Sequence, residues 1–232
     1  MTEPVAAGQP EPFGIARTFG WAAIASIAGL LSGAPLMLAL AYSSWAPLNL
    51  TDALAFGCIG ATIAEVAFFG VVVRACRWRG WRATDYLGLV RPRGNYLRSS
   101  LSVYVLTTAV SIVASTFGPL IEDANSLLEF LPPGYFVFEV AVVAPIGEEL
   151  VFRGFLYRGL AASRLGVTGA ILVTSLLWTG LHIEQTWLGL ADLFFSGVAF
   201  GWLRWRSDSA ITPIAVHGVN NIVAALVYLL FP

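Results

Sequence analysis

Long hydrophobic runs constrain this chain more than any other feature of its sequence. A helix needs about 20 apolar residues to cross the hydrocarbon core of a membrane, and seven segments approach that length. They cover residues 19–42, 53–73, 99–120, 135–157, 167–184, 187–204 and 210–231. The composition is 57% hydrophobic and 12% charged, against roughly 25% charged in an ordinary soluble domain. The sequence therefore predicts an all-α polytopic transmembrane helix bundle of about seven spans.

The basic residues predict how these spans are oriented. All thirteen are arginine, and in the seven-span arrangement each falls on the side of the N-terminus. Cytoplasmic loops carry the basic excess in membrane proteins, so we expect a protein of the cytoplasmic membrane with a polar cytoplasmic tail at 1–18 and a single membrane domain at 19–232. The formal net charge of -1 gives no basis for nucleic-acid binding. The expected partners are membrane lipid and a membrane-bound protein or peptide substrate.

Two interpretations of the basic segment at 82–100 are open. Its sequence, RATDYLGLVRPRGNYLRSS, mixes arginines with Tyr86, Leu87 and Leu89, which is typical of a stretch that lies on a membrane surface. A plain basic loop on the cytoplasmic side explains the arginines equally well.

The stretch PIGEELVFRG, residues 145–154, places two adjacent carboxylates and an arginine inside an apolar run. A charged residue at the centre of a membrane helix costs about 2.5–3.5 kcal/mol, so these groups need compensation. Residues four apart nearly align on a helix, and Glu149 is therefore predicted to pair with Arg153 as structural support. Glu148 points elsewhere and has no partner in its own helix, which makes it the candidate catalytic carboxylate.

Proline and glycine interrupt the same run. Pro145 lacks an amide hydrogen and is predicted to kink the helix about one turn earlier. Gly147 and Gly154 lie seven residues apart on one stripe, where another backbone can approach closely. Both features favour a water-accessible notch beside Glu148.

Both histidines of the chain, His182 and His217, fall in predicted spans. At 1.5 Å per residue, Glu148 and His182 each lie roughly 22 to 26 Å from the turn that joins their spans, so they are level. The predicted height of His217 is lower, and a shift or tilt of its helix by one or two turns would bring it level with Glu148 and His182. Asn221 follows His217 on the same helical face, and Asn220 points away towards a neighbouring helix. Polar bonding between helices is the alternative role of the His217 and Asn221 pair.

Three short patterns follow one another on these spans: Glu-Glu-x-x-x-Arg from Glu148, aromatic-x-x-x-His from Trp178, and His-x-x-x-Asn from His217. In this order they resemble the CAAX-protease and bacteriocin-processing (CPBP, Abi-type) family of intramembrane proteases, which includes the Ras-converting CAAX endopeptidase. The match covers about residues 135–231, the expected catalytic core, with a weaker echo in DYLGL at 85–89. Trp178 replaces the family's usual phenylalanine and alters the expected shape of the pocket.

The resemblance implies hydrolysis of a peptide bond within the membrane, and two mechanisms are open. In the first, Glu148 activates water with the help of His182. The oxyanion is then stabilised by His217 and Asn221. In the second, Glu148, His182 and His217 bind Zn²⁺ and leave the fourth position to water, in keeping with the label metalloprotease that is used for the family. A zinc ion on Glu148 leaves no evident separate base, which slightly favours the metal-independent mechanism.

Two functions from other classes are compatible with the same spans. A non-catalytic membrane adaptor or bacteriocin-immunity protein could use the polar cluster only for helix association. A proton-coupled transporter could use Glu65, Glu139 and Asp192 as a relay, although the sequence shows no inverted repeat with paired broken helices. We interpret these three acids as packing contacts. Glu139 precedes Glu148 by nine residues, which predicts opposite helical faces.

Overall fold

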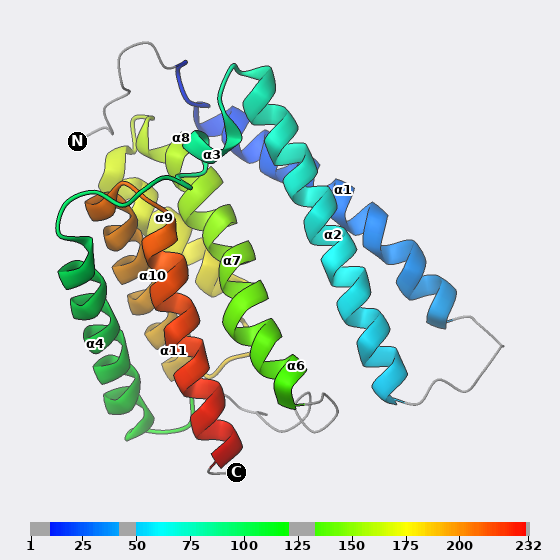
Figure 1. The fold of residues 1–232 in the computed structure, drawn as a ribbon, viewed down its shortest axis with the longest axis vertical. Helices are drawn as coiled ribbons and strands as arrows, with labels where there is room; N and C mark the ends of the chain where they lie inside the picture. The colour runs from blue at the N-terminus through cyan, green and yellow to red at the C-terminus, as the bar shows by residue number, and fades with distance from the viewer. Residues whose placement is uncertain (1–9, 42–49, 121–132, 231–232) are drawn as a thin grey trace.

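The computed structural model describes residues 10–41, 50–120 and 133–230. These residues form helices joined by turns and loops, with no strand among them (Figure 1). The helices are α1 (Ile15–Ala41), α2 (Leu50–Trp78), α3 (Ala83–Tyr86), α4 (Tyr96–Ser115), α6 (Pro133–Phe138), η1 (Glu139–Val143), α7 (Ala144–Glu149), η2 (Leu150–Leu156), α8 (Tyr157–Ala161), α9 (Gly166–Gly180), α10 (Trp187–Ser207) and α11 (Ile211–Leu230). The predicted all-α fold is confirmed for this part of the chain.

Each of the seven predicted runs coincides with one long helical stretch, and the run at 135–157 corresponds to the continuous helix from α6 to α8. Among the described residues, two helices have the length and apolarity of a membrane crossing, namely Ile15–Pro35 and Tyr96–Ser115. The apolar stretches Gly166–Gly180 and Ile211–Val227 are shorter. The number of seven crossings therefore stays a prediction. The turn before α10 covers residues 181–186.

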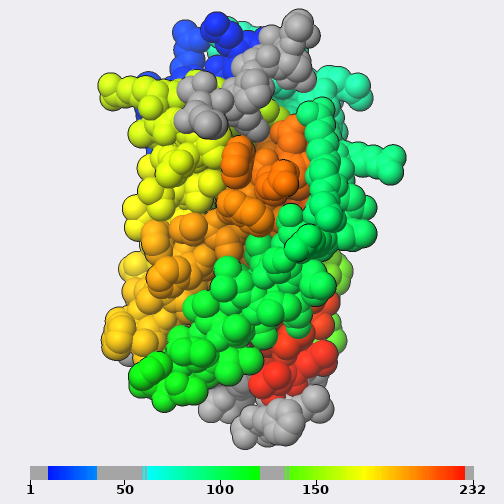
Figure 2. Space-filling view, turned by 90° about the vertical axis from the view of Figure 1, so that its left-hand side faces the viewer, coloured from blue at the N-terminus to red at the C-terminus, as the bar shows by residue number. Residues whose placement is uncertain are grey.

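The helices form a bundle with an attached hairpin. Helices α9, α10 and α11 pack with the α6–α8 helix, and α4 packs on α10 and α11. Helices α1 and α2 pair with each other and diverge from the bundle towards one end (Figure 1). On the face seen in Figure 2, α4 crosses over α10. The α6–α8 helix thus lies between the hairpin and the rest of the bundle.

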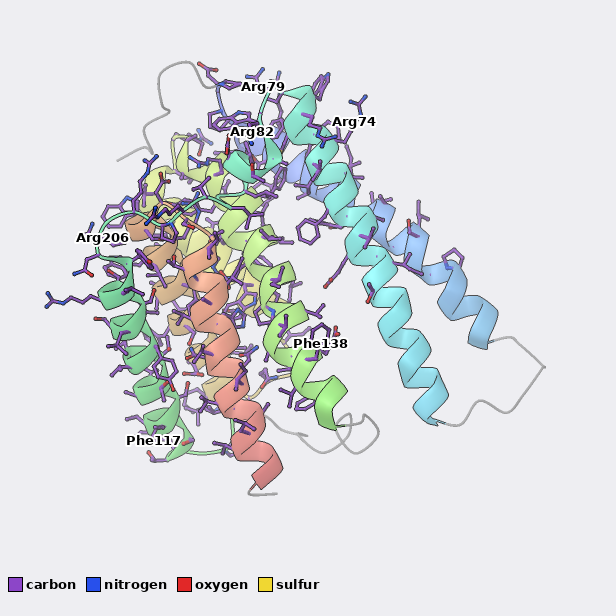
Figure 3. The ribbon with its side chains drawn as sticks, viewed as in Figure 1. Arg74, Arg79, Arg82, Phe117, Phe138 and Arg206 are labelled. Carbon is purple, nitrogen blue, oxygen red and sulfur yellow. The ribbon has the colours of Figure 1, made fainter. Side chains whose placement is uncertain are left out.

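Arginines gather at one end of the molecule. Figure 3 shows Arg74, Arg79, Arg82 and Arg206 at this end and Phe117 at the opposite end. Helix α1 begins at the arginine end and α11 runs away from it (Figure 1). This separation is the pattern that the sequence predicted, and the assignment of the arginine end to the cytoplasm stays a prediction.

The basic segment at 82–100 packs against protein in its first half, which neither interpretation offered for it included. Tyr86 is 0% exposed and Leu87 is 4% exposed, because their side chains join the core, where the Tyr86 ring lies 5.7 Å from that of Phe155. Arg158 Nη2 donates a hydrogen bond of 3.2 Å to the backbone of α3. Sequence periodicity missed this docking because the apolar residues span only one short turn.

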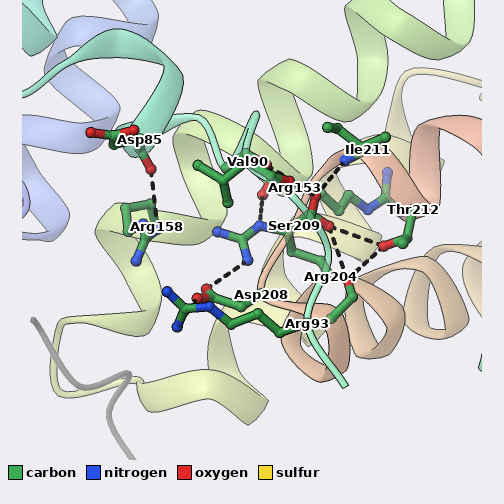
Figure 4. Close-up of polar contacts among 12 residues, drawn as sticks. Asp85, Val90, Arg93, Arg153, Arg158, Arg204, Asp208, Ser209, Ile211 and Thr212 are labelled. Carbon is green, nitrogen blue, oxygen red and sulfur yellow. Dashed lines mark hydrogen bonds and ion pairs between the residues drawn. The ribbon is translucent and has the colours of Figure 1, made fainter. Parts of the chain in front are cut away.

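The residues after α3 bind the turn between α10 and α11 (Figure 4). The amide of Ala210 donates to the carbonyl of Gly88 at 2.8 Å. The hydroxyl of Ser209 donates to the carbonyl of Val90 at 2.7 Å. These bonds hold the segment against the end of the helix that carries the second histidine motif.

Replacing Gly88 by alanine is expected to destabilise the protein by more than about 2 kcal/mol. Gly88 has φ +73°, and a Cβ placed there lies 2.9 Å from Nη2 of the buried Arg204. The left-handed backbone alone costs an L-residue roughly 1–2 kcal/mol. The clash adds to this cost because Arg204 Nε is bound to the carbonyl of Arg153 at 2.9 Å. Thermal unfolding of the purified protein in detergent measures the difference.

Gly94→Ala is the matched control for this prediction. Gly94 has a similar φ of +67°, but the nearest atom to its added Cβ is Arg206 Nη1 at 4.0 Å. Equal melting temperatures for the two variants would show that the contact with Arg204 contributes nothing.

Candidate active site

The helix from α6 to α8 is interrupted by two π-helical segments. Segment η1 occupies the turn before Pro145, which is where the missing amide of proline was predicted to distort the helix. Segment η2 follows Glu149 directly. Short π segments inside α-helices frequently occur at functional sites. Helix α7, which carries Glu148 and Glu149, thus lies between two places where the helix is underwound.

The predicted pair of Glu149 and Arg153 is confirmed. Arg153 Nη1 donates to Glu149 Oε1 at 3.0 Å, and both side chains are fully buried. Arg153 Nη2 also donates to the carbonyl of Gly197 on α10 at 3.0 Å. The guanidinium carbon lies 4.9 Å from the centre of the Trp178 ring. The pair therefore joins three helices, and its charges compensate each other inside the bundle.

Glu149 has a second partner that the sequence did not indicate. His217 Nδ1 lies 3.0 Å from Glu149 Oε1, the same oxygen that accepts from Arg153. His217 is 5% exposed, and its ring stacks on that of Phe200 at 5.1 Å. No local spacing links Glu149 with His217, because they belong to different helices. Glu149 thus fixes the orientation of the imidazole as well as the position of the arginine.

Glu148 lies outside the buried pair, as predicted. Its side chain is 28% exposed, and its Oε2 accepts a hydrogen bond from Trp178 Nε1 at 2.5 Å. The same oxygen lies 4.0 Å from His217 Nε2. His217 is thus placed between two carboxylates, with Nδ1 on Glu149 and Nε2 towards Glu148.

His182 does not lie within a helix, contrary to the expectation that both histidines belong to spans. It follows the last residue of α9, Gly180, in the turn before α10. Its Nδ1 lies 3.0 Å from the carbonyl of Trp178, and its ring packs edge-on against the Trp178 indole. Glycine and the following polar residues end α9 early. Among the described residues, His182 makes no hydrogen bond to Glu148.

The two asparagines of α11 bind neighbouring helices. Asn221 Nδ2 donates to the carbonyl of Val140 in η1 at 2.8 Å. In a π-helix this carbonyl would pair with the amide five residues later, which is Pro145 and carries no hydrogen. Asn221 therefore satisfies an acceptor that the proline leaves open. Asn220 Nδ2 donates to Thr107 Oγ1 of α4 at 2.8 Å, which confirms the predicted interhelical bond.

A cavity of about 430 Å³ lies next to these residues. Its lining includes Trp178, His182, Asp192, His217 and Asn221. Glu148 contacts Trp178 and His217 rather than the cavity itself. The structure therefore brings Glu148, Trp178 and His217 into direct contact, and places His182 and Asn221 around the adjoining space.

The acids outside the motifs have identifiable surroundings. A Cβ on Gly147 would lie 3.1 Å from Glu65 Oε1, so Glu65 of α2 packs directly against the backbone of α7. Glu65 also interacts electrostatically with both Glu139 and Glu148. The prediction that Glu139 faces away from Glu148 assumed a regular α-helix, whereas the π segment η1 changes the helical register between them. Asp192 binds Ser111 on α4.

The donor set proposed for zinc does not assemble in this arrangement. Among the described residues, no three histidine, cysteine, aspartate or glutamate side chains are grouped so that they could hold a metal ion. Glu148 and His217 approach each other, but His182 turns its Nδ1 to a backbone carbonyl. Zinc binding stays a prediction, and no feature of the described site supports the label metalloprotease.

A known protein family matches the part of the chain that contains these site residues. The model of the type II CAAX prenyl endopeptidase Rce1-like family matches residues 130–223. This segment is therefore similar to the Rce1-like family. Its bounds include all three motifs, and the family resemblance inferred from them is confirmed. Rce1-like proteins are membrane-embedded proteases, which agrees with the apolar helices of this chain.

Similar curated proteins carry names without an activity. The UPF0177 protein YbdI of Lactococcus lactis is 32% identical over 113 residues, which are 47% of this chain and 58% of the relative. An uncharacterized 24.3 kDa protein of Escherichia coli is 31% identical over 121 residues, 50% of this chain and 54% of the relative. The chain thus spans little more than half the length of these relatives. No solved structure matches it.

Proposed function

We propose that this Rce1-like chain is an intramembrane endopeptidase that hydrolyses a peptide bond in a membrane-associated protein or peptide. The observation that carries the proposal is the position of His217 between two carboxylates of different environment. Glu149 is buried and compensated by Arg153. Glu148 is partly exposed, and its Oε2 lies against Trp178 Nε1 and the edge of the His217 imidazole. One carboxylate thus supports the site, and the other is available for chemistry.

In the proposed reaction, Glu148 removes a proton from water as the water oxygen attacks the scissile carbonyl. His182 assists from the cavity side by orienting the water. The oxyanion receives hydrogen bonds from the imidazolium Nε2–H of His217 and from Asn221. With His217 protonated, its charge and that of Arg153 balance the two carboxylates. The tetrahedral intermediate then collapses, and Glu148 returns the proton to the leaving amine.

Cleavage of a quenched fluorescent peptide library by purified protein in detergent tests this proposal. The library contains prenylated and unprenylated C-terminal peptides, because the family name implies a prenylated substrate. A chelator arm decides between mechanisms: retained cleavage supports glutamate-activated water, whereas loss that zinc restores supports a metal site. Failure of the folded protein to cleave any peptide would instead support an adaptor or immunity role.

Replacing Trp178 by phenylalanine, the residue usual in the family at this position, is expected to lower kcat about tenfold. The ring packing survives, but the N–H that holds Glu148 beside His217 is lost. A hydrogen bond to a charged group contributes roughly 1.5–3 kcal/mol. Kinetics on a cleaved library peptide measure the effect.

Trp187→Phe serves as the matched control for this prediction, because Trp187 is 75% exposed at the start of α10. Unchanged kcat in Trp178→Phe would show that the indole N–H does not position the carboxylate.

A further inference from the structure

Asp192 is an acid of the candidate site that no motif includes. It lies on α10, is half-buried, and lines the 430 Å³ cavity together with His182, His217 and Asn221. The hydroxyl of Ser111 lies 2.9 Å from each of its two oxygens. Among the described residues, neither arginine nor histidine forms an ion pair with Asp192.

This lack of a cation distinguishes Asp192 from the two carboxylates of the first motif. Glu149 has Arg153, and Glu148 has the Trp178 donor and the nearby imidazole. A carboxylate among apolar helices is costly unless it is paired, and one hydroxyl compensates only part of that cost.

A second acceptor lines the same cavity. The amide of Asn220 donates to α4, but its oxygen is buried and has no donor among the described residues. The neighbouring lining residue Gln185 adds a further amide group. Asp192, Asn220 and Gln185 thus place side-chain acceptor groups among the residues that line this cavity.

We propose that Asp192, held by Ser111, is a specificity-determining residue that binds a positively charged side chain of the substrate next to the scissile bond. An ammonium or guanidinium group supplies both the charge that Asp192 lacks and several N–H donors for the surrounding acceptors. The cavity also borders His182, His217 and Asn221, so a cation bound there places the adjoining peptide bond beside the reacting groups. This inference rests on the proposed peptidase function and adds the substrate class.

Matched peptides that differ only in one lysine or acetyl-lysine test this proposal. The residue is moved in turn through the positions on either side of the cleaved bond. Wild type is expected to cleave the lysine peptide with a kcat/KM at least about tenfold higher at one position. Asp192→Asn is expected to lose this preference, so that its kcat/KM for the lysine peptide falls to its own value for the acetyl-lysine peptide.

Glu184→Gln is the matched control, because Glu184 is an exposed acid in the turn before α10 and does not line the cavity. It should keep the full lysine preference. A loss of preference in both variants would indicate general electrostatic attraction and overturn the proposal. If Asp192→Asn does not fold, Ser111→Ala is the second variant, and an unreduced lysine preference in it would contradict the assignment.

Binding of the same peptides to Glu148→Gln, measured by fluorescence anisotropy, separates this inference from the proposed function. Suppose that Glu148→Gln binds the lysine peptide more tightly than the acetyl-lysine peptide, and that the double variant with Asp192→Asn binds both equally. This result supports the cation site even if wild type cleaves neither peptide. Cleavage of lysine and acetyl-lysine peptides at equal rates at every position overturns the cation site and leaves the peptidase proposal intact.

Discussion

Glu148→Gln is expected to reduce peptide hydrolysis by at least about a hundredfold while the fold is retained. General base catalysis by a positioned side chain contributes roughly 10²–10⁴-fold, and glutamine cannot accept the proton of water. The amide oxygen of the new side chain can still accept from Trp178 Nε1, which bonds to Glu148 in the native protein. Structural disturbance should therefore be small. Rates on the best library peptide and thermal unfolding in detergent give the two readouts.

Glu139→Gln is the control for this variant. Glu139 is a partly buried acid in the same continuous helix, at the start of η1, and the proposed reaction gives it no proton to transfer. We expect activity within about twofold of wild type, since changes away from the reacting groups have small effects. Full activity in Glu148→Gln would reject the proposed base and favour a role that does not depend on catalysis.

Arg153→Met is expected to destabilise the protein by about 3–5 kcal/mol, because removing one member of a buried ion pair leaves the other charge uncompensated. Arg153 and Glu149 are both fully buried. Without the guanidinium, Glu149 retains the imidazole of His217 as its one side-chain partner among the described residues, and the carbonyl of Gly197 loses its donor. Yield of folded protein and thermal unfolding in detergent measure the loss.

Two further variants sharpen this test. Arg206→Met removes an exposed arginine of α10 and should leave stability nearly unchanged. The double variant Glu149→Gln with Arg153→Met should lose less stability than the two single variants added together, because residues in one ion pair are coupled. Strict additivity would mean that the pair does not brace the helix.

The two motif helices show which features of the site are local. Helical periodicity alone predicted that Glu149 reaches Arg153 and that Glu148 does not, and both were confirmed. Pro145 predicted the distortion that η1 displays, because a missing amide acts within one turn of its position. The ends of α9 were predicted less well, since a helix terminus depends on where the polar residues after Gly180 find partners.

Contacts between different helices could not be predicted from local sequence patterns. The bond from His217 to Glu149, the turn of His182 towards the carbonyl of Trp178, and the pairing of Asn221 with the η1 carbonyl all depend on how helices are rotated and tilted against each other. Residue spacing places a side chain on a helical face but leaves that rotation open.

The sequence by itself determined the helical segments, the separation of arginines from the opposite loops, the Glu149 and Arg153 pair, and the resemblance to a family of membrane proteases. These follow from hydrophobic length, local periodicity and motif order. Only the tertiary structure decided that one imidazole lies between two carboxylates and that Asp192 faces the same cavity without a cation. The reason is physical: such contacts form between segments far apart in the chain, whose relative positions are set by packing over the whole bundle.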